Sequence, residues 1–147
     1  MLEKSIVQEK LSASLSLLED LASSFNNGEL EKKLPLPSNQ IGQQIWCVIG
    51  ARESYLKGLM AGSWQGFSCS LNWEQTSDRD TVLKKLKESR SSIEAFISKV
   101  SDISVEQQGL LFSLIEHEAQ HHGQIIRYLY GLELTIPESW KKRYSLD

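Results

Sequence analysis

Four long stretches of this chain repeat apolar residues every three or four positions, which is the spacing of one face of an α-helix. The predicted helices cover residues 2–25, 38–60, 77–100 and 104–130. No stretch shows the strict alternation of apolar and polar residues that is typical of a strand. The sequence therefore predicts an all-α fold, a four-helix bundle in a single domain over residues 1–147. The apolar stripes of the second and fourth helices are expected to face each other across the core.

Residues that favour turns and caps define the expected ends of these helices. Asn26-Asn27-Gly28 is predicted to end the first helix, because Asn and Gly tolerate the left-handed conformation that closes a helix. Ser38 is expected to cap the second helix, and Ser77-Asp78 to begin the third. Gly131 is predicted to end the fourth, and a tail with Pro137 and Trp140 follows it.

A long loop is predicted between the second and third helices, over residues 62–76. Loops of this length without periodicity are uncommon in compact domains and are often functional. This loop contains three large aromatic residues, Trp64, Phe67 and Trp73. Two interpretations stay open: the tryptophans cap the opening of a site, or they anchor the loop.

Composition excludes several classes of function. The net charge of −3 is spread over both signs, and no basic block or stripe suggests a nucleic-acid partner. No apolar run approaches the ~18 residues of a membrane span, and no signal peptide is recognisable. Two cysteines, Cys47 and Cys69, are too few for a disulfide scaffold. We therefore expect a cytoplasmic protein with free thiols.

All three histidines lie in residues 117–122, within the predicted fourth helix. His117 and His121 are four residues apart, so their imidazoles are expected on the same face, where two neutral rings can share one divalent metal ion. Both are expected to continue the core-facing stripe of this helix, whereas His122 is about 100° away from His121 and is not expected to share the site. The alternative is that the two rings are buried and hydrogen-bonded by neighbouring side chains.

Cys47 is the candidate third ligand, because metal-binding bundles draw ligands from facing helices. It lies midway along the second helix, on a face of small or polar residues that leaves space for a site: Gln44, Cys47, Ala51 and Ser54. The alternative is that Cys47 is a small buried hydrophobe, which is the usual environment of a free cysteine.

The stretch from His117 to His121 formally matches H-E-x-x-H, the helix of zinc peptidases in which the glutamate is the general base. The extended form H-E-x-x-H-x-x-G-x-x-H fails, because position 124 is Gln and position 127 is Arg. No predicted strand offers an edge for a peptide substrate. A peptidase is therefore the weaker interpretation of this motif.

The chain resembles the DinB-like superfamily more closely. His117-Glu-Ala-Gln-His121-His-Gly123-Gln124-Ile125 is similar to that family's H-x-x-x-H-x-G-Q-[IL] signature. The segment of residues 45–56, Ile-Trp-Cys-Val-Ile-Gly-Ala-Arg-Glu-Ser-Tyr-Leu, resembles the family's second-helix segment, in which a histidine precedes an A-x-x-E-like run. Helix lengths, the loop after the second helix and the chain length agree as well.

The resemblance implies a bundle of DinB/YfiT type with a divalent metal, Zn²⁺ or Ni²⁺, bound by Cys47, His117 and His121. This chain departs from the family at Cys47, where the family usually has a histidine. A thiolate is an acceptable zinc ligand, although it weakens the Lewis acidity of the metal. Cys47 can equally mark the loss of the metal.

The resemblance implies one of two activities on a small molecule, that of a metal-dependent hydrolase or of a thiol-dependent S-transferase. A low-molecular-weight thiol is one candidate partner. Glu118 or Gln124 is the candidate group that orients a ligand imidazole, although Glu118 can also be a solvated carboxylate. A homodimer is implied too, with no residue that marks its interface. The alternative function is a metal-free, catalytically silent bundle that acts by association.

Three further residues have a simpler expected role. Arg52 and Glu53 are expected to be an ordinary polar pair at the surface or mouth of the bundle. Tyr55 either lines a cavity or packs in the core.

Overall fold

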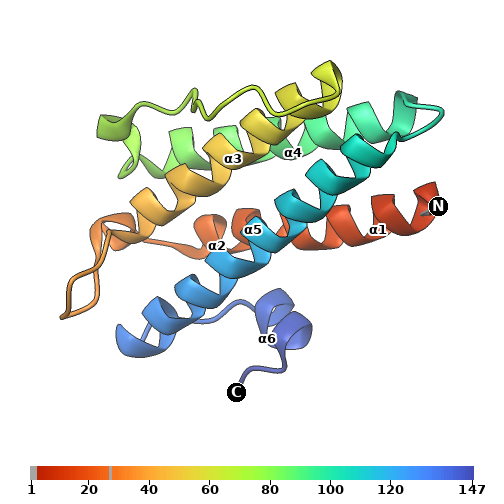
Figure 1. Ribbon diagram of the computed structural model, residues 1–147. Coiled ribbons are helices and arrows are strands. Elements are labelled where there is room, and N and C mark those ends of the chain that lie inside the picture. The colour runs from red at the N-terminus through yellow and green to blue at the C-terminus, as the bar shows by residue number, and fades with distance from the viewer. Residues whose placement is uncertain (1–2, 27) are drawn as a thin grey trace.

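The computed structural model describes residues 3–26 and 28–147, and this part of the chain is all-helical, without a strand (Figure 1). It forms six α-helices: α1 (Lys4–Leu15), α2 (Leu17–Ser24), α3 (Ile41–Ala61), α4 (Arg79–Lys99), α5 (Val105–Gly131) and α6 (Glu138–Tyr144). Two short 3-10 turns, η1 (Glu29–Glu31) and η2 (Trp73–Gln75), lie in the connections. The all-α prediction is confirmed. The expected position 2 of the first helix and Asn27 in its end signal lie outside the described residues.

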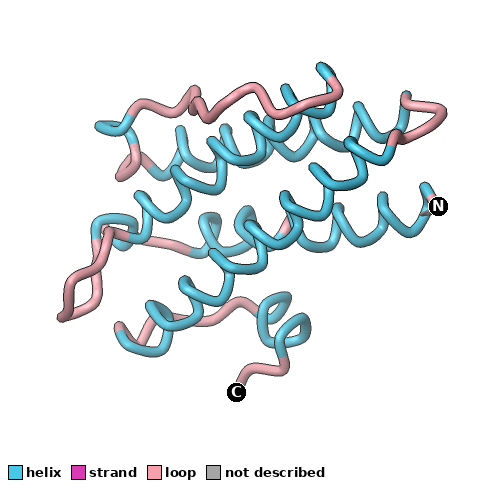
Figure 2. Tube along the Cα trace, viewed as in Figure 1, coloured by secondary structure: helices cyan, strands magenta, loops and turns pink. Residues whose placement is uncertain are grey.

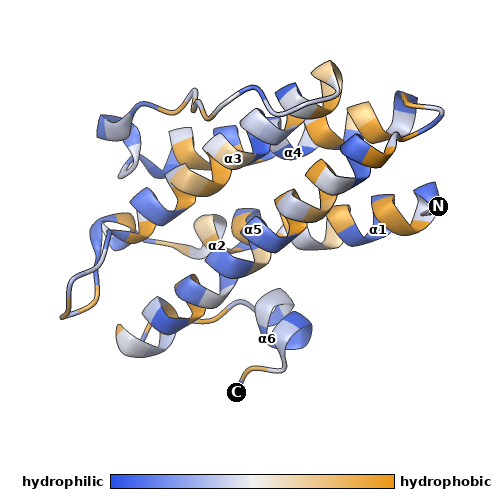
Figure 3. Ribbon diagram, in the orientation of Figure 1, coloured by the Kyte–Doolittle hydropathy of each residue, from blue (hydrophilic) through white to orange (hydrophobic). Residues whose placement is uncertain are grey.

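The long helices lie side by side, with α3 and α5 in the most extensive contact and α4 and the α1–α2 pair packed against them. The predicted pairing of the second and fourth helices is therefore confirmed. Apolar residues recur at intervals along these helices (Figure 3), and buried apolar side chains pack together in the core. They form two clusters: one contains Leu18, Ile45 and Ile125, and the other contains Leu11, Leu59 and Leu114. Within the described residues, no helix is long and apolar enough to cross a membrane.

The first predicted helix is interrupted at Ser16, which separates α1 from α2. The prediction of one continuous helix was wrong in this respect. On either side of the break, backbone carbonyls accept hydrogen bonds from side chains of other elements. Arg52 donates to the Leu15 oxygen at 2.9 Å, and the Trp140 indole donates to the Leu17 oxygen at 2.7 Å. Carbonyls taken by such donors are less available to the helical ladder, which accounts for a break at this point.

Helix α3 begins later than expected. Gln40, and not Ser38, caps it, through a capping box in which the side chain of Gln43 accepts from the Gln40 backbone N–H at 2.9 Å. The Ser38 hydroxyl instead bonds the backbone of Leu34. The other starts match the prediction closely, because Asp78 caps α4 and Ser104 caps α5.

The predicted loop over residues 62–76 is present and runs along the outside of α3 (Figure 2). Side-chain bonds tie it to that helix: Ser54 bonds the backbone of Ser68, and Glu53 accepts from the N–H and the hydroxyl of Ser70. Phe67 lies directly over Gly50, where a Cβ atom would be 2.4 Å from the ring. The loop therefore packs on α3 and leaves little room between them.

The aromatic residues of this loop act as anchors. Trp73 packs edge-on against Trp46, with ring centroids 5.1 Å apart, and Trp64 packs against Tyr55 at 5.0 Å. Of the two interpretations of the tryptophans, the structure favours anchoring. Tyr55 packs against the cluster around Leu59, so its packing role is also the one observed.

The C-terminal tail forms a helix that completes the core. Trp140 on α6 is fully buried, and its indole bond to Leu17 connects α6 to α2. The sequence predicts only a tail here, and it misses both the helix and its part in the core. Besides Trp140, the partly buried side chains of Ile136, Tyr144 and Leu146 pack against the same cluster.

Candidate metal site

His117 and His121 lie together on α5, as their spacing predicts. Their ring centroids are 4.5 Å apart and the ring planes are tilted by 52°. Both side chains are half-buried at the edge of the contact between α5 and α3. Burial lowers the pKa of both rings, that of His121 to about 4 with a further contribution from His117. Both imidazoles are therefore neutral at pH 7, which is the form that binds a metal ion.

Gln44 on α3 holds the ring of His121. The Gln44 side-chain oxygen lies 2.8 Å from Nδ1 of His121. An amide oxygen only accepts hydrogen bonds, so Nδ1 carries the proton and Nε2 keeps its lone pair. This is the arrangement by which outer residues fix the tautomer of a metal-ligating histidine. The sequence interpretation assigned this orienting role to Glu118 or Gln124, and the structure gives it to Gln44.

His117 has an unpaired polar atom. Its Nδ1 is buried and has no hydrogen-bond partner among the described residues. A buried polar atom without a partner costs about 1–3 kcal/mol. A cation bound at this nitrogen would give it the missing partner. The donor chemistry of the pair thus fits a divalent metal as two of its ligands.

The third predicted ligand does not complete a site in this structure. In residues 3–26 and 28–147, no three His, Cys, Asp or Glu side chains gather in a way that could hold a metal ion. Cys47 is half-buried, one turn along α3 from Gln44, and α3 and α5 are antiparallel. That register places Cys47 at the level of His117. Burial raises the pKa of its thiol, so the free protein holds Cys47 protonated.

The core-facing stripe of α5 differs from the predicted one. It runs through Glu118 and His122, which are 1% and 0% exposed, and His117 and His121 lie at its edge. The expectation that the histidine pair faces the core was therefore wrong. The periodicity of apolar residues alone cannot show this, because the residues that occupy the core positions here are polar.

Arg52 explains how Glu118 is buried. Its guanidinium, itself 0% exposed, makes two bonds to the Glu118 carboxylate, one of them from Nε at 3.1 Å. It also donates to backbone oxygens of Leu15 and Leu86. Although burial alone raises the pKa of Glu118, the charge of Arg52 lowers it to about 2. The expectation of Arg52 as a surface residue, and of Glu118 as solvated, was wrong.

His122 joins this buried ion pair to α6. Its Nε2 lies 3.3 Å from a Glu118 oxygen, and its Nδ1 lies 2.6 Å from the Tyr144 hydroxyl. As predicted, His122 takes no part in the pair formed by His117 and His121. Residues 117–122 therefore divide into two pairs. His117 and His121 lie at the edge of the contact between α5 and α3, whereas Glu118 and His122 are buried in the core.

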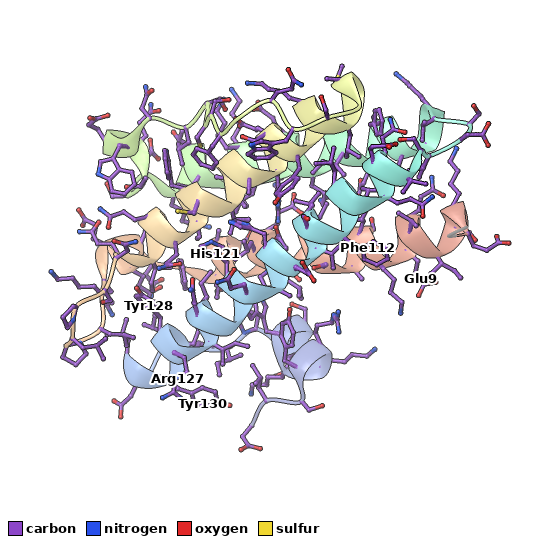
Figure 4. The ribbon with its side chains drawn as sticks, viewed as in Figure 1. Glu9, Phe112, His121, Arg127, Tyr128 and Tyr130 are labelled. Atoms are coloured by element: carbon purple, nitrogen blue, oxygen red, sulfur yellow. The ribbon has the colours of Figure 1, made fainter. Side chains whose placement is uncertain are left out.

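A groove opens beside the histidine pair. It has a volume of about 550 Å³ and lies between the connector that precedes α3 and the helices α3 and α5. Its lining is Leu34, Pro37, Ser38, Asn39, Gln44, Gln124, Arg127 and Tyr128. Gln44 is shared between the groove and His121, and none of these residues is acidic. Figure 4 shows His121, Arg127 and Tyr128 following one another along α5.

Comparison with known proteins does not assign the chain to a family. No protein-family model matches it, and no curated protein matches it.

Proposed function

We propose that this chain is a DinB-like bundle protein that binds one divalent metal ion, Zn²⁺ or Ni²⁺, through His117 and His121. The observation that carries the proposal is the pair itself. The centroids of two neutral rings lie 4.5 Å apart, one ring is fixed through Nδ1 by Gln44, and the other has a buried nitrogen without a partner among the described residues. Leaving this buried nitrogen unpaired is unfavourable unless a ligand compensates for it.

Each nearby residue has a definite part in this proposal. His117 and His121 supply neutral nitrogens, and Gln44 keeps Nε2 of His121 free of its proton. Cys47 is the proposed third ligand. Its thiol must lose a proton and move toward the pair, because the side chains are not yet gathered for coordination. Metal binding is therefore expected to release a proton when Cys47 takes part.

The proposed substrate is a small molecule that enters through the groove beside the pair. Gln124 and Arg127 line that groove and offer hydrogen-bond donors to it. The bound metal would supply either a water of lowered pKa for hydrolysis or a site for a low-molecular-weight thiol in S-transfer. The chain's own residues would orient the substrate. The substrate proposal rests on the resemblance of the helix motif and on the position of this groove.

Calorimetric titration with Zn²⁺ tests the proposal on the untagged protein. We expect one site in the wild type, and a loss of affinity of at least about 100-fold in His117→Ala and in His121→Ala. Gln120→Ala is the matched control, because Gln120 is an exposed neighbour on α5 outside the pair. Equal affinity in the wild type and both histidine variants would overturn the proposal.

The role of Cys47 is tested separately with Cys47→Ser. If the thiolate is a ligand, the variant binds Zn²⁺ more weakly and no longer releases the extra proton, which titrations in two buffers of different ionisation enthalpy measure. If affinity and proton release are both unchanged, Cys47 is not a ligand, and the metal has two protein ligands.

A second candidate function is a metal-free bundle that acts by association. One observation favours it, namely that no group of three potential ligands is assembled in the described part of the chain. Under this alternative, the bond from His121 to Gln44 is purely structural. The same titration distinguishes the two functions, because the metal-free bundle binds no Zn²⁺ at a defined stoichiometry.

A further inference from the structure

Helix α5 presents an outer face along which a row of residues is exposed, although near its C-terminal end the Tyr130 hydroxyl accepts a hydrogen bond from the Asp147 backbone N–H at 3.3 Å. In Figure 1 it crosses in front of α1 and α2, and Figure 4 labels Phe112, His121, Arg127 and Tyr130 along its length. Phe112 is 52% exposed and Tyr130 is 45% exposed, which is high for large aromatic side chains on a helix. The other exposed residues of this face that matter here are Glu116, Ala119, Gly123 and Arg127.

These six residues form three pairs with nearly the same midpoint in the sequence. Phe112 and Tyr130 are centred on residue 121, and so are Ala119 and Gly123. Glu116 and Arg127 are centred between residues 121 and 122, an offset that corresponds to less than about 1 Å along a helix. Aromatic pairs with aromatic, small with small, and acid with base.

Such a pattern is self-complementary about a two-fold axis. When two copies of a helix pack antiparallel, each residue on one side of the axis faces the residue at the same distance on the other side. With the axis at the level of residue 121, Glu116 of one copy faces Arg127 of the second, and the reverse pair forms as well. Ala119 and Gly123 near the axis allow close approach, since a Cβ at Gly123 would have no atom within 4 Å.

Glu116 and Arg127 are exposed charges of opposite sign on this face. Within residues 3–26 and 28–147, neither Glu116 nor Arg127 forms an ion pair. Being 11 residues apart on one straight helix, they lie too far apart to pair with each other. A second molecule can therefore supply an oppositely charged partner to each of these exposed charges, at the edge of the groove that Arg127 also lines.

We propose that the outer face of α5 is the interface for a second copy of this chain, packed antiparallel about a two-fold axis at the level of His121. The interface consists of two Glu116–Arg127 ion pairs and two Phe112–Tyr130 contacts, with the small residues at its centre. It does not depend on metal binding, because none of its six residues is a proposed ligand.

Charge reversal tests this interface, with the dissociation constant measured by sedimentation equilibrium. Glu116→Arg and Arg127→Glu each place like charges opposite one another twice. We expect each to weaken the dimer by at least about tenfold. The double variant, Glu116→Arg with Arg127→Glu, restores opposite charges across the axis and is expected to bring the dissociation constant back to within a few-fold of the wild type.

Lys87→Glu is the matched control, an exposed charge reversal on α4, and it is expected to leave the dissociation constant unchanged. The helical circular dichroism of every variant confirms that it is folded. A wild type that stays monomeric at high micromolar concentration would overturn the proposal. So would a dimer that both single reversals leave intact, or a double variant no better than the single ones.

Discussion

At the scale of the residue, the decisive finding is that Glu118 and His122 are core residues, whereas His117 and His121 lie at the edge of a helix contact. The sequence shows one cluster of polar residues, and the structure separates it into two. The separation depends on Arg52, which is 66 positions before Glu118 in the sequence. Local patterns cannot reveal a partner so distant, and Glu53 next to Arg52 in the sequence suggests a different one.

The buried ion pair gives the first prediction. Glu118→Gln leaves the charge of Arg52 buried without its counterion, and we expect it to lower the free energy of unfolding by about 3–5 kcal/mol. The double variant Arg52→Met with Glu118→Leu removes both charges and is expected to be more stable than Glu118→Gln alone. Urea unfolding measures both. If the double variant is the less stable of the two, the pair is not a coupled buried ion pair.

The pH dependence of stability gives the second prediction. Burial lowers the pKa of His121 from 6.5 to about 4, so between these two pH values the unfolded chain binds more protons than the folded one. Titration of this group therefore does not affect the free energy of unfolding above pH 6.5. Below that pH it lowers the free energy of unfolding progressively as the pH falls toward 4. We expect metal-free His121→Gln to lose less stability than the wild type between pH 7 and pH 4.5. Parallel pH profiles of the two proteins would contradict this account.

At the scale of the element, the sequence predicts well what depends on local pattern. The starts of α4 and α5 agree with their caps, Asp78 and Ser104, because capping is a matter of a few adjacent residues. The break at Ser16 was not predictable in the same way. It coincides with donors from Arg52 and Trp140, which approach only after the chain has folded.

Close approach of the loop to α3 gives the third prediction. A Cβ at Gly42 would be 2.0 Å from the backbone oxygen of Thr76, where no side-chain rotation relieves the clash. We expect Gly42→Ala to destabilise the protein by several kcal/mol, more than the ordinary range of about 0.5–3 kcal/mol for point mutations. Gly109→Ala is the control. Its Cβ has open space on α5, and helix propensity predicts a gain of about 0.5–1 kcal/mol.

Thermal unfolding of both glycine variants checks this prediction. The melting temperature should fall for Gly42→Ala and rise slightly for Gly109→Ala. Equal melting temperatures would show that the end of the loop is not held against the first turn of α3.

At the scale of the whole molecule, α6 belongs to the core and is not an appendage. Trp140 is buried between α6 and α2, and Tyr144 bonds His122, so α6 covers the buried ion pair from outside. We expect Trp140→Ala to cost about 3–5 kcal/mol, because it leaves a cavity and an unpaired Leu17 oxygen. Urea unfolding measures it. A loss below about 1 kcal/mol would mean that α6 only rests on the surface.

In the candidate site too, contacts within one helix can be predicted from the sequence, whereas contacts between helices cannot. The spacing of His117 and His121 predicts their juxtaposition, and the structure confirms it. Gln44, which fixes His121, lies on the face of α3 that the sequence already marked, but its contact depends on the register of α3 against α5. The position of Cys47 depends on the same register and on the rotamer of its thiol. Its role as a ligand stays a prediction.

Metal analysis of the untagged protein tests most directly whether the histidine pair binds a metal ion. After incubation with Zn²⁺ and removal of free metal, the protein should retain one Zn²⁺ per chain and melt at a higher temperature than the chelator-treated form. His117→Ala should retain none. A wild type that retains no Zn²⁺ and melts at the same temperature with and without chelator would contradict the claim.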